Sequence, residues 1–241
     1  MRGLLQDDAA TADAYLAWWR LAGVDSAIGE SPVNWLRPVA ARPATPMAAT
    51  ITASIVEKPR TLESFLEWLA HDPAQPERRW TGAQIAPSGP AQATLMVVTD
   101  LPDPFDIGEG RLLADRAGLL FDAMLRAIGL HRDAIHLASL FTARPPGGMV
   151  EAADLVHAAD RMRTHVALAQ PRRLLLLGDR TIRALMPTDG AASPDSLRQF
   201  NHDGGIVPAV ATFHPRLLLT QPAAKAECWR ALQSLIEETR P

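Results

Sequence analysis

The sequence predicts an α/β fold: a three-layer sandwich in which a four-stranded parallel sheet is flanked by helices, with a helical and loop N-terminal extension. Two observations predict it. After about residue 93, short apolar runs typical of buried parallel strands alternate four times with helix-forming segments. The length of 241 residues also suits one sizeable domain with an attached segment.

The first part of the chain, 1–90, is expected to be a helical and proline-rich extension that packs on a core domain spanning 91–241. Residues 9–22 have apolar side chains at helical spacing, which predicts a helix. Its aromatic face, with Trp18 and Trp19, favours packing on the main domain, and a surface for DNA or a protein partner is the alternative. Three segments are expected next: a linker over 31–60, a helix over 61–70 and a loop over 71–90.

The core domain is expected to alternate strands and helices. The predicted strands are 94–99, 134–140, 173–178 and 207–213, the predicted helices are 115–129, 149–170, 179–186 and 222–238, and loops are expected over 100–114 and 187–205. Right-handed crossovers place the carboxyl ends of parallel strands at one edge, where open α/β sheets bind ligands. We therefore expect Asp100, Ser139, Gly178 and His214 to converge there.

The composition excludes several classes of protein. The single cysteine, Cys228, rules out an internal disulfide and a cysteine-ligated zinc or iron–sulfur site. The net charge of −3 gives no global sign of nucleic-acid binding. Because neither a signal peptide nor a run of 18 apolar residues is found, we expect a cytoplasmic protein with no membrane association, and a monomer.

A histidine followed by proline ends the last predicted strand. Proline disfavours the α region for the residue before it and suits the first turn of a helix, so His214 should be extended at a helix start. This position suits a ligand-binding histidine, and a hydrogen-bonded turn residue is the equal alternative.

Acidic and basic side chains follow the first two predicted strands. Asp100, Asp103, Asp106 and Glu109 could bind a metal or activate water, although their spacing matches no specific metal motif, and a solvated acidic loop is the alternative. Arg144 begins a proline-stiffened loop that could grip a phosphate or simply connect two elements. Phosphate-binding glycine motifs and a nucleophile elbow are absent from the sequence.

Residues 91–238 resemble the uracil-DNA glycosylase superfamily, nearest to the bacterial iron–sulfur group called family 4. The similarity is one of block order and spacing, over residues 99–103, 110–118, 124–132, 144–146, 171–178 and 212–219, followed by Pro222, Lys225, Trp229 and Leu232. The block around His214 is the most specific. The four cluster cysteines of that group are missing, and Ala143 stands where one would precede Arg144. We therefore expect neither an iron–sulfur cluster nor another metal.

The resemblance implies roles for individual residues. It implies catalytic roles for Asp100, Asp106 and His214, base binding by Leu101, Leu113 and Ser139, and DNA binding by Arg144 and Arg216. Leu113 stands in place of the family's stacking aromatic residue, and Ser139 in place of the asparagine that reads the edge of uracil. Strict uracil specificity is therefore not expected.

The resulting hypothesis is a divergent DNA glycosylase that hydrolyses the N-glycosidic bond of a flipped damaged or deaminated base, with single- or double-stranded DNA as its partner. The sequence leaves open whether the protein is an enzyme. A catalytically inactive DNA- or protein-binding descendant is the main alternative, and a hydrolase of free nucleosides or nucleotides is a third.

Overall fold

The computed structural model describes residues 59–186 and 197–237. All of these residues belong to one compact unit, Ile55–Pro241. The helix predicted over 9–22 and nearly all of the predicted linker lie outside the described residues.

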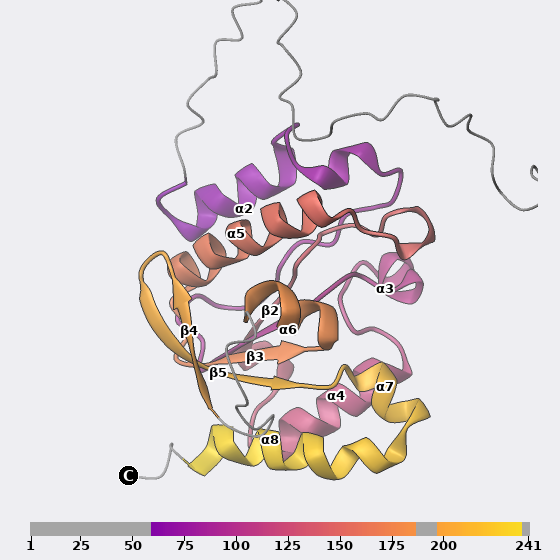
Figure 1. The fold of residues 1–241 in the computed structure, drawn as a ribbon, viewed down its shortest axis with the longest axis vertical. Helices are drawn as coiled ribbons and strands as arrows, with labels where there is room; N and C mark the ends of the chain where they lie inside the picture. Colours follow the sequence, from indigo (N-terminus) through magenta and orange to yellow (C-terminus); the bar gives the residue numbers. More distant parts are fainter. Residues whose placement is uncertain (1–58, 187–196, 238–241) are drawn as a thin grey trace, which may run out of the picture. The chain divides into compact units, whose positions relative to one another are not determined.

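A five-stranded sheet in the order β2-β1-β3-β5-β4 forms the centre of this unit (Figure 1). Its strands are β1 Leu95–Thr99, β2 Ile135–Ser139, β3 Leu174–Leu177, β4 Arg198–His202 and β5 Gly205–Thr212. The four predicted strands correspond to β1, β2, β3 and β5, which run parallel to one another, whereas β4 pairs antiparallel with β5. The expectation of a four-stranded, wholly parallel sheet is therefore wrong: the sheet is mixed.

The additional strand β4 lies in the segment 187–205, which the sequence predicted as a loop. Phe200 is its one fully buried residue, so it lacks the apolar run that identifies a central strand. His202 pairs with Gly205, which leaves Asp203 and Gly204 as a two-residue turn. Asp-Gly is a strong hairpin signal, and here it explains how an edge strand forms from a polar segment.

The helices are α2 Leu62–His71, α3 Pro104–Glu109, α4 Arg116–Ala127, α5 Ala152–Ala169, α6 Asp179–Leu185, α7 Pro215–Thr220 and α8 Lys225–Glu237. Short 3₁₀ turns occupy Pro76–Arg79, Arg132–Ala134, Pro146–Gly148 and Pro222–Ala224. All the predicted helices in the described residues are present with bounds shifted by a few residues. The short α3 is unexpected and lies in the predicted loop 100–114; Pro104 begins it and Asp103 caps it.

Helices cover both faces of the sheet, which makes the three layers (Figure 1). Alternate residues of β1 enter two separate cores, Met96 and Val98 on one face and Leu95 and Val97 on the other. The first core is completed by α5 and α6, with α2 outside them; the second is completed by α4, α7 and α8. The parallel strands are consequently buried on both sides, as the apolar runs predicted.

Residues 59–90 lie against this domain. Phe65 of α2 is buried, and its ring lies 4.8 Å from the ring of His165 on α5. Glu77 forms a buried ion pair with Arg161 of α5 at 2.6 Å. Both contacts fix the segment that precedes β1 onto the helical layer over one face of the sheet.

The strand order positions the functional cleft. In the sheet, β2 lies on one side of β1, and β3, the next strand along the chain, lies on the other side of β1. The loops after β1 and β3 therefore diverge, which opens a crevice at the carboxyl ends of the strands. None of the helices in the described part of the chain has the length and apolar composition needed to span a bilayer.

Candidate active site

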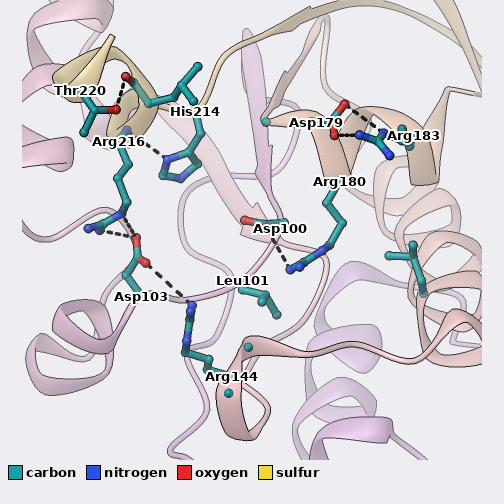
Figure 2. A pocket seen from close by; sticks show the side chains of 15 residues that line it. Asp100, Leu101, Asp103, Arg144, Asp179, Arg180, Arg183, His214, Arg216 and Thr220 are labelled. Atoms are coloured by element: carbon teal, nitrogen blue, oxygen red, sulfur yellow. Dashed lines mark hydrogen bonds and ion pairs between the residues drawn. The ribbon is translucent and has the colours of Figure 1, made fainter. Parts of the chain in front are cut away.

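A cleft of about 920 Å³ opens at the carboxyl edge of the sheet (Figure 2). Loops that follow four strands line it: Asp100 comes after β1, Arg144 after β2, Gly178 after β3 and His214 after β5. Its volume is within the range of small-molecule and cofactor sites. The predicted convergence of strand ends is therefore confirmed for three of its four residues; Ser139 does not line the cleft.

His214 is held at the start of α7 by its own helix. It is the N-cap residue, and its Nδ1 accepts a hydrogen bond from the backbone N–H of Arg216 at 3.2 Å. Burial lowers the pKa of His214 and the positive charge of Arg216 acts in the same direction, against the carboxylates of Asp100, Asp103 and Asp106. The imidazole is therefore neutral at neutral pH, and because Nδ1 is an acceptor, the proton is on Nε2.

A glycine directly after β3 lies beside this histidine. Gly178 has a φ of +88°, and a β-carbon there would lie 3.4 Å from the Cβ of His214. Its backbone N–H also donates to the carbonyl of Thr212, two residues before His214. Since 3.4 Å is an ordinary van der Waals separation, the positive φ rather than a lack of space favours glycine at this position.

Asp100 lies in the same cleft and is paired with an arginine. Its Oδ2 accepts a hydrogen bond from Arg180 of α6 at 3.1 Å. The side chains of both residues are about one-third exposed, at 30% and 37%. Leu101, which is buried, lies beside them (Figure 2).

Four further charged residues, Arg216, Asp103, Asp115 and Arg144, form a network at the opposite wall. Arg216 donates from Nε to Asp103 at 2.9 Å and from a terminal nitrogen to Asp115 at 3.0 Å. Arg144 lies 3.8 Å from Asp103 and donates to the carbonyl of Pro102. Burial raises the pKa of Asp103 although Arg216 opposes it, whereas hydrogen bonds from backbone amides, with Arg216, outweigh burial and lower the pKa of Asp115.

A family model supports the resemblance seen in the sequence. The model of the uracil DNA glycosylase superfamily matches residues 86–233, which is more than half of the chain. The chain belongs to the uracil DNA glycosylase superfamily. The matched range contains all five strands and every residue that lines the cleft. A comparison with curated proteins gives no match. Placement near family 4 within the superfamily stays a prediction.

Five of the eight residues to which the resemblance gave a role line the cleft of this superfamily member: Asp100, Leu101, Arg144, His214 and Arg216. The other three lie outside it. Asp106 is 2% exposed and accepts hydrogen bonds from the backbone N–H groups of Asp103 and Ala114, at 3.0 and 2.8 Å. It thereby fastens α3 to the loop that follows.

The two predicted base-binding residues outside the cleft, Leu113 and Ser139, are also buried. Leu113 belongs to the core under α4, with a φ of +53°. Ser139 ends β2, and its Oγ donates to the carbonyl of Phe141 at 2.6 Å. Neither side chain is available to a base in this arrangement.

The resemblance gave no role to Arg180, Arg183 or Asp103, which also line the cleft. Asp103 was noted only as part of an acidic loop. Arg180 and Arg183 are in the first turns of the helix after β3, so their position after a strand end was the signal available.

The chain does not fit the iron–sulfur cluster of the family 4 group. Its single cysteine, Cys228, is buried in α8, where burial raises the pKa of the thiol. Ala143, at the position before Arg144, is fully buried. Within the described residues, no group of three or more histidine, cysteine or acidic side chains could hold a metal ion.

Proposed function

We propose that this superfamily member is a divergent DNA glycosylase that hydrolyses the N-glycosidic bond of a damaged or deaminated base flipped out of DNA. The observation that supports it most is that His214 and Asp100 share one cleft, with Nδ1 of the imidazole occupied by an internal donor. That hydrogen bond leaves the Nε2 proton as the donor available to a ligand. Membership of the superfamily supplies DNA as the substrate class.

The reaction is a hydrolysis at C1′ of the sugar. The base leaves the stack because its glycosidic bond cannot be reached inside the duplex. The C1′–N bond breaks with its electron pair on the base, and His214 donates a hydrogen bond to the oxygen on which negative charge develops. Asp100 stabilises the cationic sugar and accepts a proton from the attacking water, whose oxygen bonds to C1′ and whose proton finally neutralises the base.

The lining of the cleft argues against strict specificity for uracil. Among its described lining residues, His214 is the one ring-bearing side chain, and none is asparagine or glutamine. Stacking of a base on an aromatic side chain contributes about 1–3 kcal/mol, and that contribution is replaced here by aliphatic contact with Leu101 and Leu217. We therefore expect the cleft to select a base by the size of the base and by its hydrogen bond with His214, rather than by a full set of hydrogen bonds to the edge of the base.

The test is cleavage of oligonucleotides, single- and double-stranded, that contain one uracil, hypoxanthine or xanthine, followed by alkali to break the abasic strand. Under single-turnover conditions the wild type should release at least one of these bases. Loss of an oxyanion-stabilising donor typically lowers the rate about 10²–10³-fold, so His214→Ala should show a loss of that order. If the wild type cleaves none of the substrates faster than the Asp100→Ala, His214→Ala double variant, the proposal is wrong.

One observation favours a second candidate, a glycosylase-like protein that binds DNA without turnover. Asp100 is already ion-paired with Arg180, and two of the three residues expected to bind a base, Leu113 and Ser139, are buried away from the cleft. This candidate predicts salt-dependent binding to abasic or undamaged DNA with no base release. A free nucleoside supplied beside the oligonucleotide separates both candidates from a nucleoside hydrolase, which would cleave the nucleoside.

A further inference from the structure

Arg216 joins the starts of three helices. Its guanidinium contacts Asp103, the N-cap of α3, and Asp115, the N-cap of α4, while its backbone N–H donates to His214, the N-cap of α7 (Figure 2 shows the contacts to Asp103 and His214). The two aspartates are about a hundred residues away from Arg216 in the sequence. A single side chain therefore links α7 to the two other helices.

The two carboxylates that Arg216 contacts are poorly solvated. The side chains of Asp103 and Asp115 are only 16% and 15% exposed. Withdrawing the guanidinium toward a phosphate would leave both carboxylates without their shared cation at sites where unpaired charge is costly. The pair formed by Arg183 and Asp179 differs, since both side chains are more than 70% exposed and can separate at little cost.

We propose that Arg216 is a positioning residue for His214 rather than a phosphate contact. It fixes the first turn of α7 against α3 and α4, and this fixes where Nε2 of His214 points in the cleft. The catalytic part of the proposal rests on the proposed glycosylase function; the structural part does not.

The charges around His214 give the proposal a signature that is independent of activity. Asp100, Asp103 and Asp106 each raise the pKa of His214, and Arg216 lowers it together with burial. Replacing Arg216 by glutamine removes the nearby cation and leaves Asp103 with only the more distant Arg144, at 3.8 Å, as an ion-pair partner. Both effects raise the pKa of His214, and so does any loosening of α7 that admits water.

The chain offers matched variants. Arg216→Gln removes the clamp, and Arg216→Lys keeps the charge but cannot bind two carboxylates through a planar fork. Asp115→Asn removes one carboxylate outside the cleft while asparagine still caps α4, since Asp115 accepts from Ala117. Arg163→Gln is the control, because it removes an arginine of an ion pair, with Asp160 on α5, that is outside the cleft.

The first measurement is a pH titration of the histidine rings by long-range ¹H–¹⁵N NMR on the full chain, with His214→Gln to assign the signal. The wild type should show the Nε2–H form of His214. Arg216→Gln should raise the His214 midpoint and mix the two neutral forms, Arg216→Lys should give a smaller change, and Arg163→Gln should match the wild type. An unchanged His214 signal in both Arg216 variants would overturn the proposal. If Arg216→Gln does not fold, the His214 signal of Arg216→Lys alone decides whether Arg216 positions His214.

The second measurement separates positioning from phosphate contact. Single-turnover base release should fall at least about tenfold in Arg216→Gln and several-fold in Asp115→Asn, while the dissociation constant for DNA changes less than about twofold. A phosphate contact predicts the reverse: weaker binding and a salt slope reduced by about one in Arg216→Gln, and tighter binding in Asp115→Asn as the guanidinium is released. If the wild type releases no base, the glycosylase proposal fails, and the NMR and DNA-binding results still decide the role of Arg216.

Discussion

The Nε2 atoms of His136 and His165 lie 3.0 Å apart, buried between β2 and α5. Burial lowers the pKa of both imidazoles, and for His165 the neighbouring His136 and Arg161 add to the effect. The pair therefore shares one hydrogen bond in its neutral form, and burial opposes its protonation.

This pair predicts that stability falls at mildly acidic pH. The unfolded chain binds protons at the ordinary histidine value of 6.5, whereas the folded pair does not, so the free energy of unfolding decreases as the pH falls below about 6.5. Urea unfolding at about pH 7.5 and pH 5.5 measures this directly. His165→Leu should flatten the dependence, while His157→Gln, at an exposed position on α5, should leave it intact. Equal slopes in the wild type and His165→Leu would contradict the assignment.

The buried ion pair between Glu77 and Arg161 predicts a large stability effect. Their side chains are 0% and 3% exposed, and Glu77 also accepts from the backbone N–H of Thr142. Glu77→Gln leaves the arginine charge buried without its partner and should cost about 3–5 kcal/mol. Asp160→Asn breaks an exposed pair with Arg163 and should cost less than about 1 kcal/mol. Comparable urea midpoints for the two variants would show that the buried pair contributes little.

Two helical glycines predict opposite responses to the same substitution. A β-carbon on Gly118 of α4 would lie 1.8 Å from the carbonyl oxygen of Leu113, whereas one on Gly108 of α3 meets nothing within 4 Å. Alanine favours a helix over glycine by up to about 1 kcal/mol. Gly108→Ala should therefore be neutral or stabilising, and Gly118→Ala should lose about 2–4 kcal/mol because the loop must move. Thermal unfolding of both variants tests this, and a stabilised Gly118→Ala would show that the loop yields freely.

The pairing of the cleft arginines predicts a weak salt dependence of DNA binding. Arg144, Arg180, Arg183 and Arg216 each lie within 4 Å of a carboxylate of the chain. Few unpaired cations then meet phosphate, and the slope of log affinity against log salt should be shallower than about −2. Asp179→Asn frees Arg183 and should steepen the slope by up to about one. Fluorescence anisotropy over a range of salt provides the measurement; a steep wild-type slope would mean that these ion pairs open on DNA.

The parallel strands were predictable because their burial on both faces requires uninterrupted apolar runs, such as 94–99 and 173–178. The edge strand β4 could not be predicted in this way, because it has one buried residue, Phe200, and therefore no apolar pattern. The helix α3 could not be predicted either, because its six residues are too few to show a helical periodicity. The Asp203-Gly204 turn and the Asp103-Pro104 helix start were local signals that the prediction did not use.

The candidate site could likewise be predicted from the sequence only in part. Asp100 and His214 were predicted because strand ends converge, a consequence of topology alone. The base-binding roles of Leu113 and Ser139 came from their place in a motif, which gives the order of residues but not the direction of a side chain. Ser139 was also expected at the converging strand ends, but its hydroxyl bonds to Phe141 and it does not line the cleft. The pairing of Arg180 with Asp100 joins residues 80 apart in sequence, and no local pattern specifies it.

The link through Arg216 has a consequence for the electric field in the cleft. The peptide dipoles of α3, α4 and α7 all have their positive ends at the capping residues that this side chain joins. Because the arginine charges are matched by carboxylates, the oriented amides of α3 and α7, whose capping residues Asp103 and His214 line the cleft, supply a larger share of the attraction that an anion at the cleft experiences. That attraction falls off within about one helical turn, so it acts on charge that forms inside the cleft and hardly on an anion that is still in solution.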